Sequence, residues 1–445
     1  MTEKLNLVVI CLDTMRYDMI RRLGVDWIRT PNMDRLASQS VVFENCFAEG
    51  LPTLRGWHRI PPQQTTMAEL LQHAGYTSAL IGDTPHMNRA GNFHRGFTCY
   101  DWIRGQESDS FNTGPADAAD LSKHVKSGAK NTQRLRMLFQ YLLNIKDRRT
   151  EDDYFCAQVF DKSARWLEEN VDNQPLFLWA DSFDPHEPWD PPTRFADLYC
   201  PGYEGPELIL AGVDDGLTPK EKERVKALYC GEVTFVDERL GRLLDTIERL
   251  SLRDNTIVML VTDHGTELYE HGGLHKSGQR LFPYLTRQAW LVRHPRLGFK
   301  ERRVKPFVQT EDVFPTTLGL LGVSHGPVDG VDVWSLATGE RAVVRDHVIT
   351  GFQSFASVRD EEWNFCINFE KPGARGQLYH HASDTSEQKD VAGDCPDVVD
   401  KQRKRLEALL GQPLPAKLPD RTVPTEAPYH KHFEKLLKAG KIALP

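Results

Sequence analysis

Acidic and histidine side chains follow several apolar runs, at the point where each run gives way to polar sequence. Asp13 closes the run LNLVVICLD, Asp263 and His264 close NTIVMLVTDHG, and His186 lies in DPHEPWDPP just after PLFLWADSFD. Two carboxylates and an imidazole are a ligand set suited to a divalent metal ion. Each residue alone could equally be a helix cap or part of a turn. Their recurrence at the ends of such runs favours one shared site.

The apolar runs are predicted to be strands, because they are continuous and rich in β-branched residues, as buried parallel strands are. Segments with helical spacing lie between them, several with threonine or proline at the start. This alternation predicts an α/β fold with a mostly parallel central sheet sandwiched by helices. Its site is expected outside the carboxyl ends of the strands. The predicted strands are 5–13, 76–83, 175–184, 255–265 and 288–295, and the predicted helices are 30–38, 65–75, 157–171 and 217–252.

Changes in composition and in the pattern of apolar residues divide the chain into three predicted parts. Residues 1–340 form the predicted α/β domain that carries the candidate site. Residues 341–411 hold shorter alternating segments and the charged helix DVVDKQRKRLEALLG, which predicts a smaller C-terminal α+β subdomain. Residues 412–445 are rich in proline and lysine and are expected to form an extended tail over the surface.

Composition limits the classes of partner. The chain has 445 residues and a formal net charge of -8, without a long basic run, so a nucleic-acid partner is not expected. The first apolar run is too short for a signal peptide or a membrane span, so we expect a cytoplasmic protein without membrane contact. The 8 cysteines form no C-x-x-C pair and are expected to be reduced and inert.

A set of motifs extends along most of the chain: NLVVICLDTMRYD, TPNMDRLASQSVVFENCFA, AELLQHAGYTSALIGD, HEPWDPP, VTDHGTELYEHG followed by HK, and VQTEDVFPTTLGLLG. Together these motifs resemble the sulfatase branch of the alkaline phosphatase superfamily. The resemblance implies an alkaline phosphatase-like fold and a metal bound by Asp13, Asp263 and His264. It also implies that His186 assists the leaving oxygen and that Lys276 binds the non-bridging oxygens of an ester. The alternatives without a functional role are that His186 is a loop histidine packed under Trp189 and that Lys276 is a solvated lysine.

Two positions depart from the pattern of the calcium-binding members of that family. Many of those have a second aspartate after the first and an asparagine after the late aspartate, where this chain has Thr14 and His264. An imidazole ligand suits Mn²⁺ or Zn²⁺ better than Ca²⁺, which prefers oxygen ligands but is not excluded. The substitution favours the phosphonate monoester hydrolase and phosphodiesterase side of the group.

The nucleophile segment departs further. Family members carry C-x-P-x-R or S-x-P-x-R, and some relatives have threonine at the nucleophile position, which Thr53 in GLPTLRG matches. Threonine cannot become formylglycine, so a covalent step would use its own hydroxyl. The family's proline and arginine are replaced by Arg55 and Trp57, and the helix that normally follows is missing. Arg55 is the predicted replacement for the anion clamp, with His275 as a second substrate-binding residue; Arg59 is the other candidate clamp.

The leading hypothesis is a metal-dependent hydrolase of small anionic sulfate, phosphate or phosphonate esters. In it, Thr53 or a water molecule attacks, His186 protonates the leaving group and Lys276 neutralises charge. The shortened segment after Thr53 motivates an alternative, a degenerate sulfatase-fold protein that binds an anionic ligand or partner without efficient turnover. A third idea is a transferase of a charged group between alcohols. By analogy with the family, a homo-oligomer formed through C-terminal segments is also considered.

Overall fold

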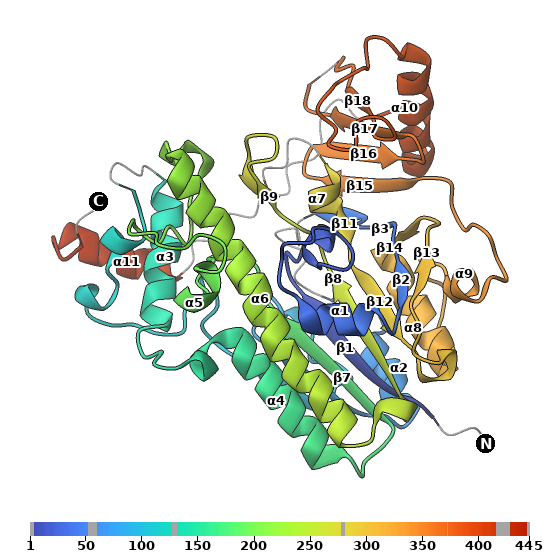
Figure 1. Cartoon of the computed structure of the whole chain (residues 1–445), viewed down its shortest axis with the longest axis horizontal. Helices are drawn as coiled ribbons and strands as arrows, with labels where there is room; N and C mark the ends of the chain where they lie inside the picture. The colour runs from blue at the N-terminus through green and yellow to red at the C-terminus, as the bar shows by residue number, and fades with distance from the viewer. Residues whose placement is uncertain are drawn as a thin grey trace.

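The predicted apolar runs form the middle of an eight-stranded sheet in the computed structural model (Figure 1). The structure describes residues 4–51, 60–126, 131–276, 281–371, 373–414 and 428–442. In spatial order the strands of this sheet are β13 (Arg302–Val304), β2 (Val41–Phe43), β12 (Trp290–Arg293), β8 (Thr256–Thr262), β1 (Asn6–Leu12), β7 (Leu176–Ser182), β5 (Thr77–Gly82) and β6 (Cys99–Trp102).

The sheet is mostly parallel, as predicted. Strands β8, β1, β7, β5 and β6 pair in parallel, and among the described strands of this sheet β12 alone runs in the opposite direction. The predicted strand 288–295 is therefore a strand, but it is antiparallel to its neighbours. Leu12 on β1 is in register with Ser182 on β7 and Thr262 on β8, so the three central strands end at one level. Residues just beyond these ends are neighbours in space.

Helices cover both faces because alternate residues of each central strand point to opposite sides. Val8, Ile10 and Leu12 of β1 belong to one core, and Leu7 and Val9 belong to another. The first core is closed by helices α1 (Pro31–Ala37), α3 (Thr132–Asn144), α4 (Phe155–Asn170), α5 (Thr193–Ala196) and α6 (Pro219–Arg249). The second is closed by α2 (Met67–His73), α8 (Val313–Leu321) and α9 (Trp334–Thr338).

Helix starts follow local sequence signals. Thr66 caps α2 and Thr218 caps α6, each in a capping box with the glutamate three residues later. Pro219 and Pro31 occupy first-turn positions, where the missing backbone N–H costs no hydrogen bond. These caps confirm the predicted helices and fix where the chain turns back to the sheet.

The C-terminal subdomain has its own antiparallel sheet, which takes in a strand from far upstream. Strand β4 lies just before the Thr53 segment, yet it pairs in parallel with β15, so the two parts of the chain share a sheet. The division near residue 340 stays a prediction. The subdomain consists of β15 (Val348–Phe352), β16 (Phe355–Arg359), β17 (Trp363–Asn368), β18 (Gln377–His380), α10 (Pro396–Leu410) and β4 (Gly50–Leu51).

Short strands and one short helix connect the large sheet to this subdomain. They form a three-stranded sheet of β11 (Arg287–Gln288), β3 (Cys46–Phe47) and β14 (Val308–Gln309), a pair of β9 (Glu267–Leu268) and β10 (Leu274–His275), and the turn of α7 (Pro283–Thr286).

The tail that was expected to be extended contains the helix α11 (Pro428–Lys438). Phe433 is fully buried, with its ring 5.5 Å from that of Phe139 on α3, and Arg136 forms a 2.6 Å ion pair with Glu434. This helix lies beside α3 in Figure 1. Among the described residues, no helix has the length and apolar character needed to span a membrane. The 8 cysteines are free, as predicted.

Candidate active site

Asp13 sits on a turn that starts where β1 ends. The next residue, Thr14, has a φ of 59°, an outlying conformation for a β-branched residue that persists only where the surroundings impose it. Tyr229 of α6 donates a hydrogen bond to the Thr14 carbonyl at 3.0 Å and accepts one from the Arg16 N–H at 3.1 Å. The Thr14 hydroxyl donates to Asp13 Oδ1 at 2.7 Å. The turn thereby fixes one carboxylate oxygen of Asp13.

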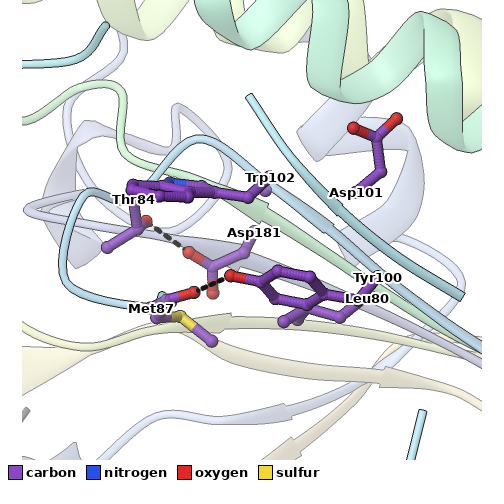
Figure 2. A pocket seen from close by; sticks show the side chains of 8 residues that line it. Leu80, Thr84, Met87, Tyr100, Asp101, Trp102 and Asp181 are labelled. Atoms are coloured by element: carbon purple, nitrogen blue, oxygen red, sulfur yellow. Dashed lines mark hydrogen bonds between the residues drawn. The ribbon is translucent and has the colours of Figure 1, made fainter. Parts of the chain in front are cut away.

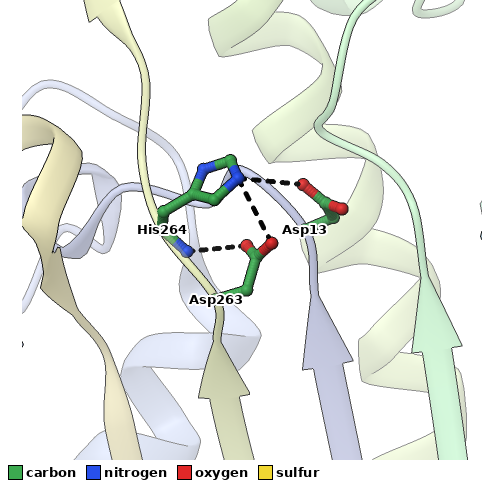
Figure 3. Close-up of side chains that lie close together, drawn as sticks. All are labelled: Asp13, Asp263 and His264. Atoms are coloured by element: carbon green, nitrogen blue, oxygen red, sulfur yellow. Dashed lines mark hydrogen bonds and ion pairs between the residues drawn. The ribbon is translucent and has the colours of Figure 1, made fainter. Parts of the chain in front are cut away.

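Asp263 and His264 follow β8, the neighbour of β1, so the parallel register brings them next to Asp13 (Figure 3). Asp263 Oδ1 accepts the N–H of Thr14 at 2.9 Å and that of His264 at 2.7 Å. His264 Nε2 lies 3.3 Å from Asp263 Oδ2 and 3.9 Å from Asp13 Oδ1. The three side chains offer one ligand atom each, all within 4.8 Å of one another. The structure thus brings the three predicted metal ligands together.

The protonation state of His264 follows from its partners. Nδ1 lies 2.9 Å from the carbonyl oxygen of Gly265, which can only accept, so Nδ1 carries the proton. Burial, reinforced by the charge of Lys276, lowers the pKa of His264 to about 4. The ring is therefore neutral near pH 7, and the lone pair of Nε2 points toward the two carboxylates. That is the form of histidine that binds a metal.

The two carboxylates are poorly stabilised without a cation. Burial and then repulsion from Asp263 raise the pKa of Asp13 to about 8, and burial raises that of Asp263 to about 6. A divalent cation between them would reverse this penalty, because a metal ion adds the largest local charge in such a site. The donor set therefore fits a divalent metal.

A second cluster contains His186, which follows β7 on a loop. Its ring stacks on Phe183 with centroids 4.0 Å apart, whereas the alternative to a functional role was packing under Trp189. Nδ1 donates to the Glu187 carbonyl at 2.6 Å, and Nε2 accepts from Lys276 Nζ at 2.6 Å. Burial lowers the pKa of His186 well below its usual value, against the opposing effect of Glu187 and with the help of Lys276. The burial of the ring therefore favours the neutral form of His186.

Glu187 completes this second cluster. Lys276 Nζ lies 3.3 Å from both of its carboxylate oxygens. Burial disfavours the charge on Glu187, but the three nitrogen-bearing side chains around it hold its pKa well below the usual range. Lys276 is largely buried and forms an ion pair with Glu187, so it is not a solvated surface lysine.

His275 supports Glu187 from the other side. Its Nε2 donates to the Ala211 carbonyl at 2.7 Å, its Nδ1 lies 3.8 Å from Glu187, and its ring packs 4.6 Å from that of Trp189. It has a φ of 60°, a second strained residue at the site. Its predicted role in binding substrate stays a prediction.

The two clusters act on each other electrostatically. The charge of Lys276 lowers the pKa of both Asp13 and Asp263 and disfavours a charge on His264. A group between them would meet metal ligands on one side and an ammonium on the other.

Glu187, and Glu107 on the loop after β6, were not singled out in the sequence interpretation. Glu187 lies inside the quoted HEPW motif, but its neighbours on the later loop could not be foreseen from spacing. Glu107 lies in a loop without a motif; burial and the charge of Glu187 raise its pKa to about 7.

The predicted nucleophile Thr53 and the predicted substrate-binding Arg55 lie outside the described residues, as do Trp57 and Arg59. The chain enters this stretch from β4. It is described again from Ile60, whose N–H donates to Gly91 O at 2.8 Å and whose carbonyl accepts from Asn92 at 2.9 Å.

Asp181 also lies near the end of β7 but belongs to neither cluster. It faces a small cavity of about 10 Å³ between β7, β5 and β6 (Figure 2). Thr84, which lines the same cavity, donates a hydrogen bond to Asp181 Oδ1. Trp179 Nε1 donates to its other oxygen at 3.0 Å. These bonds occupy both carboxylate oxygens. The cavity is lined by Leu80, Gly82, Thr84, Met87, Tyr100, Asp101, Trp102 and Asp181.

Comparison with known proteins agrees with this geometry. An arylsulfatase of Clostridium perfringens is 25% identical over 396 residues, which cover 78% of this chain and 81% of that protein. The crystal structure of a phosphonate monoester hydrolase of Agrobacterium radiobacter superposes with a TM-score of 0.71 at 21% identity, covering 92% of this chain and 95% of that one. The phosphonate monoester hydrolase SpPMH of Silicibacter pomeroyi gives a TM-score of 0.69 at 18% identity, with 92% and 95% covered.

These two structural likenesses confirm the alkaline phosphatase-like fold. The sulfatase family model matches residues 5–323, which include both clusters and all eight strands of the central sheet. The chain belongs to the sulfatase family, whose members are ester hydrolases.

Proposed function

We propose that this protein hydrolyses small anionic esters of sulfate or of phosphate and phosphonate, with a metal bound by Asp13, Asp263 and His264. The single observation that carries the proposal is the convergence of one ligand atom each from Asp13, Asp263 and His264, all within 4.8 Å of one another. The relatives named above include both an arylsulfatase and phosphonate monoester hydrolases, so both classes of ester are candidates.

Mn²⁺ or Zn²⁺ is the proposed metal, in preference to Ca²⁺. The donor set includes one imidazole nitrogen, which those two ions accept readily, whereas Ca²⁺ takes oxygen ligands. When bound, such an ion polarises an ester oxygen and stabilises developing negative charge.

Lys276 and His186 serve the leaving oxygen in this proposal. His186 is neutral and accepts a hydrogen bond from Lys276, so a proton for the leaving oxygen comes from Lys276, directly or through His186 Nε2. Glu187 holds Lys276 beside His186 by a charged contact. This refines the sequence-based role of His186, which was given as the proton donor by itself.

Thr53 is the proposed nucleophile, with a water molecule as the alternative. The support is its match to the threonine variant of the family motif and its position two residues beyond β4. An attack by its hydroxyl would displace the alcohol and leave an ester on Thr53, which water would then cleave.

The test is turnover by chelator-treated protein supplied with Mn²⁺, Zn²⁺, Ca²⁺ or no metal. The substrates are 4-nitrophenyl sulfate, 4-nitrophenyl phosphate, bis(4-nitrophenyl) phosphate and 4-nitrophenyl phenylphosphonate. We expect hydrolysis that requires Mn²⁺ or Zn²⁺, and the best substrate decides between sulfur and phosphorus. Absence of metal-dependent turnover on all four would contradict the proposal.

Thr53→Ala, with Thr53→Ser as its matched control, addresses the nucleophile. If the hydroxyl attacks, the alanine variant loses activity and the serine variant keeps a measurable part of it. Equal activity of the alanine variant and the unmodified protein would assign the attack to water.

A further inference from the structure

Arg16 is a buried arginine on the turn that follows β1, close in sequence to Asp13. Its side chain is only 5% exposed. Its Nε and Nη2 donate to the two carboxylate oxygens of Asp18, at 2.8 and 2.6 Å. Asp18 lies on the same stretch of chain, so this two-point contact fixes the direction of the guanidinium group.

The same side chain reaches the segment that follows His264. Arg16 Nη1 donates to the carbonyl of Thr266 at 3.3 Å. A Cβ atom at Gly265 would lie 2.9 Å from Arg16 Cγ and 2.0 Å from the carbonyl oxygen of Tyr284. The arginine therefore packs directly against the residue after His264, where a side chain has no room. It links the two chain segments that supply the candidate metal ligands.

A third contact of Arg16 extends to the hairpin formed by β9 and β10. Its Nη1 also donates to Glu270 Oε1 at 2.5 Å, and Glu270 lies in the turn of this hairpin. The other carboxylate oxygen of Glu270 accepts the N–H of Leu268 at 2.6 Å. The ion pair thus joins the hairpin turn to the turn after β1.

This hairpin leads directly to Lys276. Its strands are paired with His275 opposite Glu267, and Lys276 is the residue after β10. The carboxylate of Glu267 accepts the N–H groups of His271 and Gly273, at 3.0 and 2.8 Å. These bonds make the hairpin one unit, so a contact at its turn affects the position of Lys276 at its end.

We propose that Arg16 is a positioning residue, which holds Lys276 in place relative to the candidate metal ligands through Glu270. This role rests on the proposed function, in which the ammonium group of Lys276 serves the leaving oxygen. A reacting group is effective only when it is held at the right distance and angle. Arg16 supplies that restraint, because its guanidinium contacts both the segment after His264 and the hairpin that carries Lys276.

The test measures how fast the amine of Lys276 is acetylated. N-hydroxysuccinimidyl acetate modifies the lysines that solvent reaches, and mass spectrometry of peptides gives the rate at each position. The exposed Lys401 is the internal reference. Lys276 is largely buried and in contact with His186 and Glu187, so its amine should react slowly in the unmodified protein. Displacement of the hairpin would expose it.

Arg16→Met and Glu270→Ala break the ion pair from either side. Loss of a charge-assisted contact that holds a local segment should raise the acetylation rate of Lys276 about tenfold in each variant. The double variant should react no faster than Arg16→Met, because both changes remove the same contact. Glu270 is partly exposed, so Glu270→Ala keeps the test informative should Arg16→Met fail to fold.

The matched controls come from the ion pair of Arg293 and Glu248. It also joins a buried arginine to a partly exposed glutamate, at 2.9 Å, but it links the end of β12 to α6. Arg293→Met and Glu248→Ala should leave the acetylation rate of Lys276 close to that of the unmodified protein. An unchanged rate in Glu270→Ala would overturn the proposal. Equal acceleration in the controls would also overturn it, since it would show a general loosening of the fold.

Turnover provides a second readout that a merely structural role would not move. Glu270→Ala should lower kcat more than it changes KM, and the loss should grow as the leaving alcohol becomes less acidic. In a Lys276→Ala background, the same substitution should have no further effect on kcat. A loss of equal size in that background would overturn the proposal.

The two proposals can fail separately, because acetylation requires no turnover. Absence of turnover by the unmodified protein would contradict the proposed function. The acetylation rates of Lys276 in Glu270→Ala and in the controls would still decide whether Arg16 and Glu270 hold the lysine in place.

Discussion

The two halves of the candidate site are held in place by different means. Asp13, Asp263 and His264 follow adjacent parallel strands, and backbone N–H groups and a hydroxyl orient their oxygens. His186 and Lys276 come from loops far apart in the chain and are held together by charge and by hydrogen bonds among themselves. The sheet positions the three proposed metal ligands, here called the metal half. Charge and hydrogen bonds position His186 and Lys276, called the leaving-group half after their proposed role.

Because the two halves are held in place differently, they should also fail differently. Losing a residue of the metal half should remove the metal and all chemistry with it. Losing a residue of the leaving-group half should slow the reaction while the metal stays bound.

His264→Ala tests the metal half and should have the largest effect. The variant loses the one nitrogen ligand of the set, so we expect purified protein to retain little Mn²⁺ or Zn²⁺ and kcat/KM to fall about 10³-fold or more. Metal content by atomic emission and initial rates are the measurements. His325→Ala, an exposed histidine, is the matched control. Full metal content in His264→Ala would contradict the assignment.

Lys276→Ala tests the leaving-group half. Removal of the ammonium should lower kcat by about 10²- to 10³-fold with metal content unchanged. The loss should grow as the leaving alcohol becomes less acidic, because protonation then matters more. A series of aryl esters of graded acidity measures this slope, with Lys401→Ala, exposed on α10, as the control. Loss of the metal in Lys276→Ala would erase the proposed distinction between the halves.

Thr14→Ala probes the link between backbone and ligand in the metal half. It deletes the hydroxyl that orients Asp13, so metal affinity should fall about tenfold, as for other residues that orient a metal ligand. Thr14→Ser keeps the hydroxyl and should bind metal nearly as well as the unmodified protein. Competition with a fluorescent chelator gives both affinities; equal loss in the two variants would instead implicate the methyl group.

The pH dependence of stability should show the smallest effect, and only without metal. Folding raises the pKa of Asp13 from 3.8 to about 8, so the folded protein binds more protons than the unfolded chain between these values. The contribution to stability is full below pH 4 and is lost as the pH rises toward 8. We expect the Tm of chelated protein to fall by about 6 °C over that range through this group. Asp13→Asn should flatten the trend, and a trend that persists in that variant would assign it to other groups.

Much of the fold could be predicted from the sequence, because continuous apolar runs determine buried strands whatever their partners. The run at 255–265 contains β8. Asp263 and His264, which follow directly after that strand, are two of the candidate ligands. The reversed direction of β12 could not be predicted, since a buried run has the same composition in either orientation. The pairing of β4 with β15 joins residues about 300 apart and leaves no local pattern.

The candidate site was predictable only where strand ends determine it. Asp13 and His264 could be predicted because each follows the end of an apolar run. The strained turn at Thr14 could not, because it depends on Tyr229 of α6, a contact across the core. Glu187 and Glu107 gain their importance from neighbours on other loops. The helix in the tail was missed because its stabilising partner, α3, is distant in sequence.

The most direct test of the account is a crystal structure of the protein with Mn²⁺ or Zn²⁺, with anomalous data collected at the absorption edge of the metal. We expect one anomalous peak within bonding distance of Asp13, Asp263 and His264 Nε2, with Lys276 still in contact with His186. A peak elsewhere, or a fully active protein without a peak between these three side chains, would contradict it.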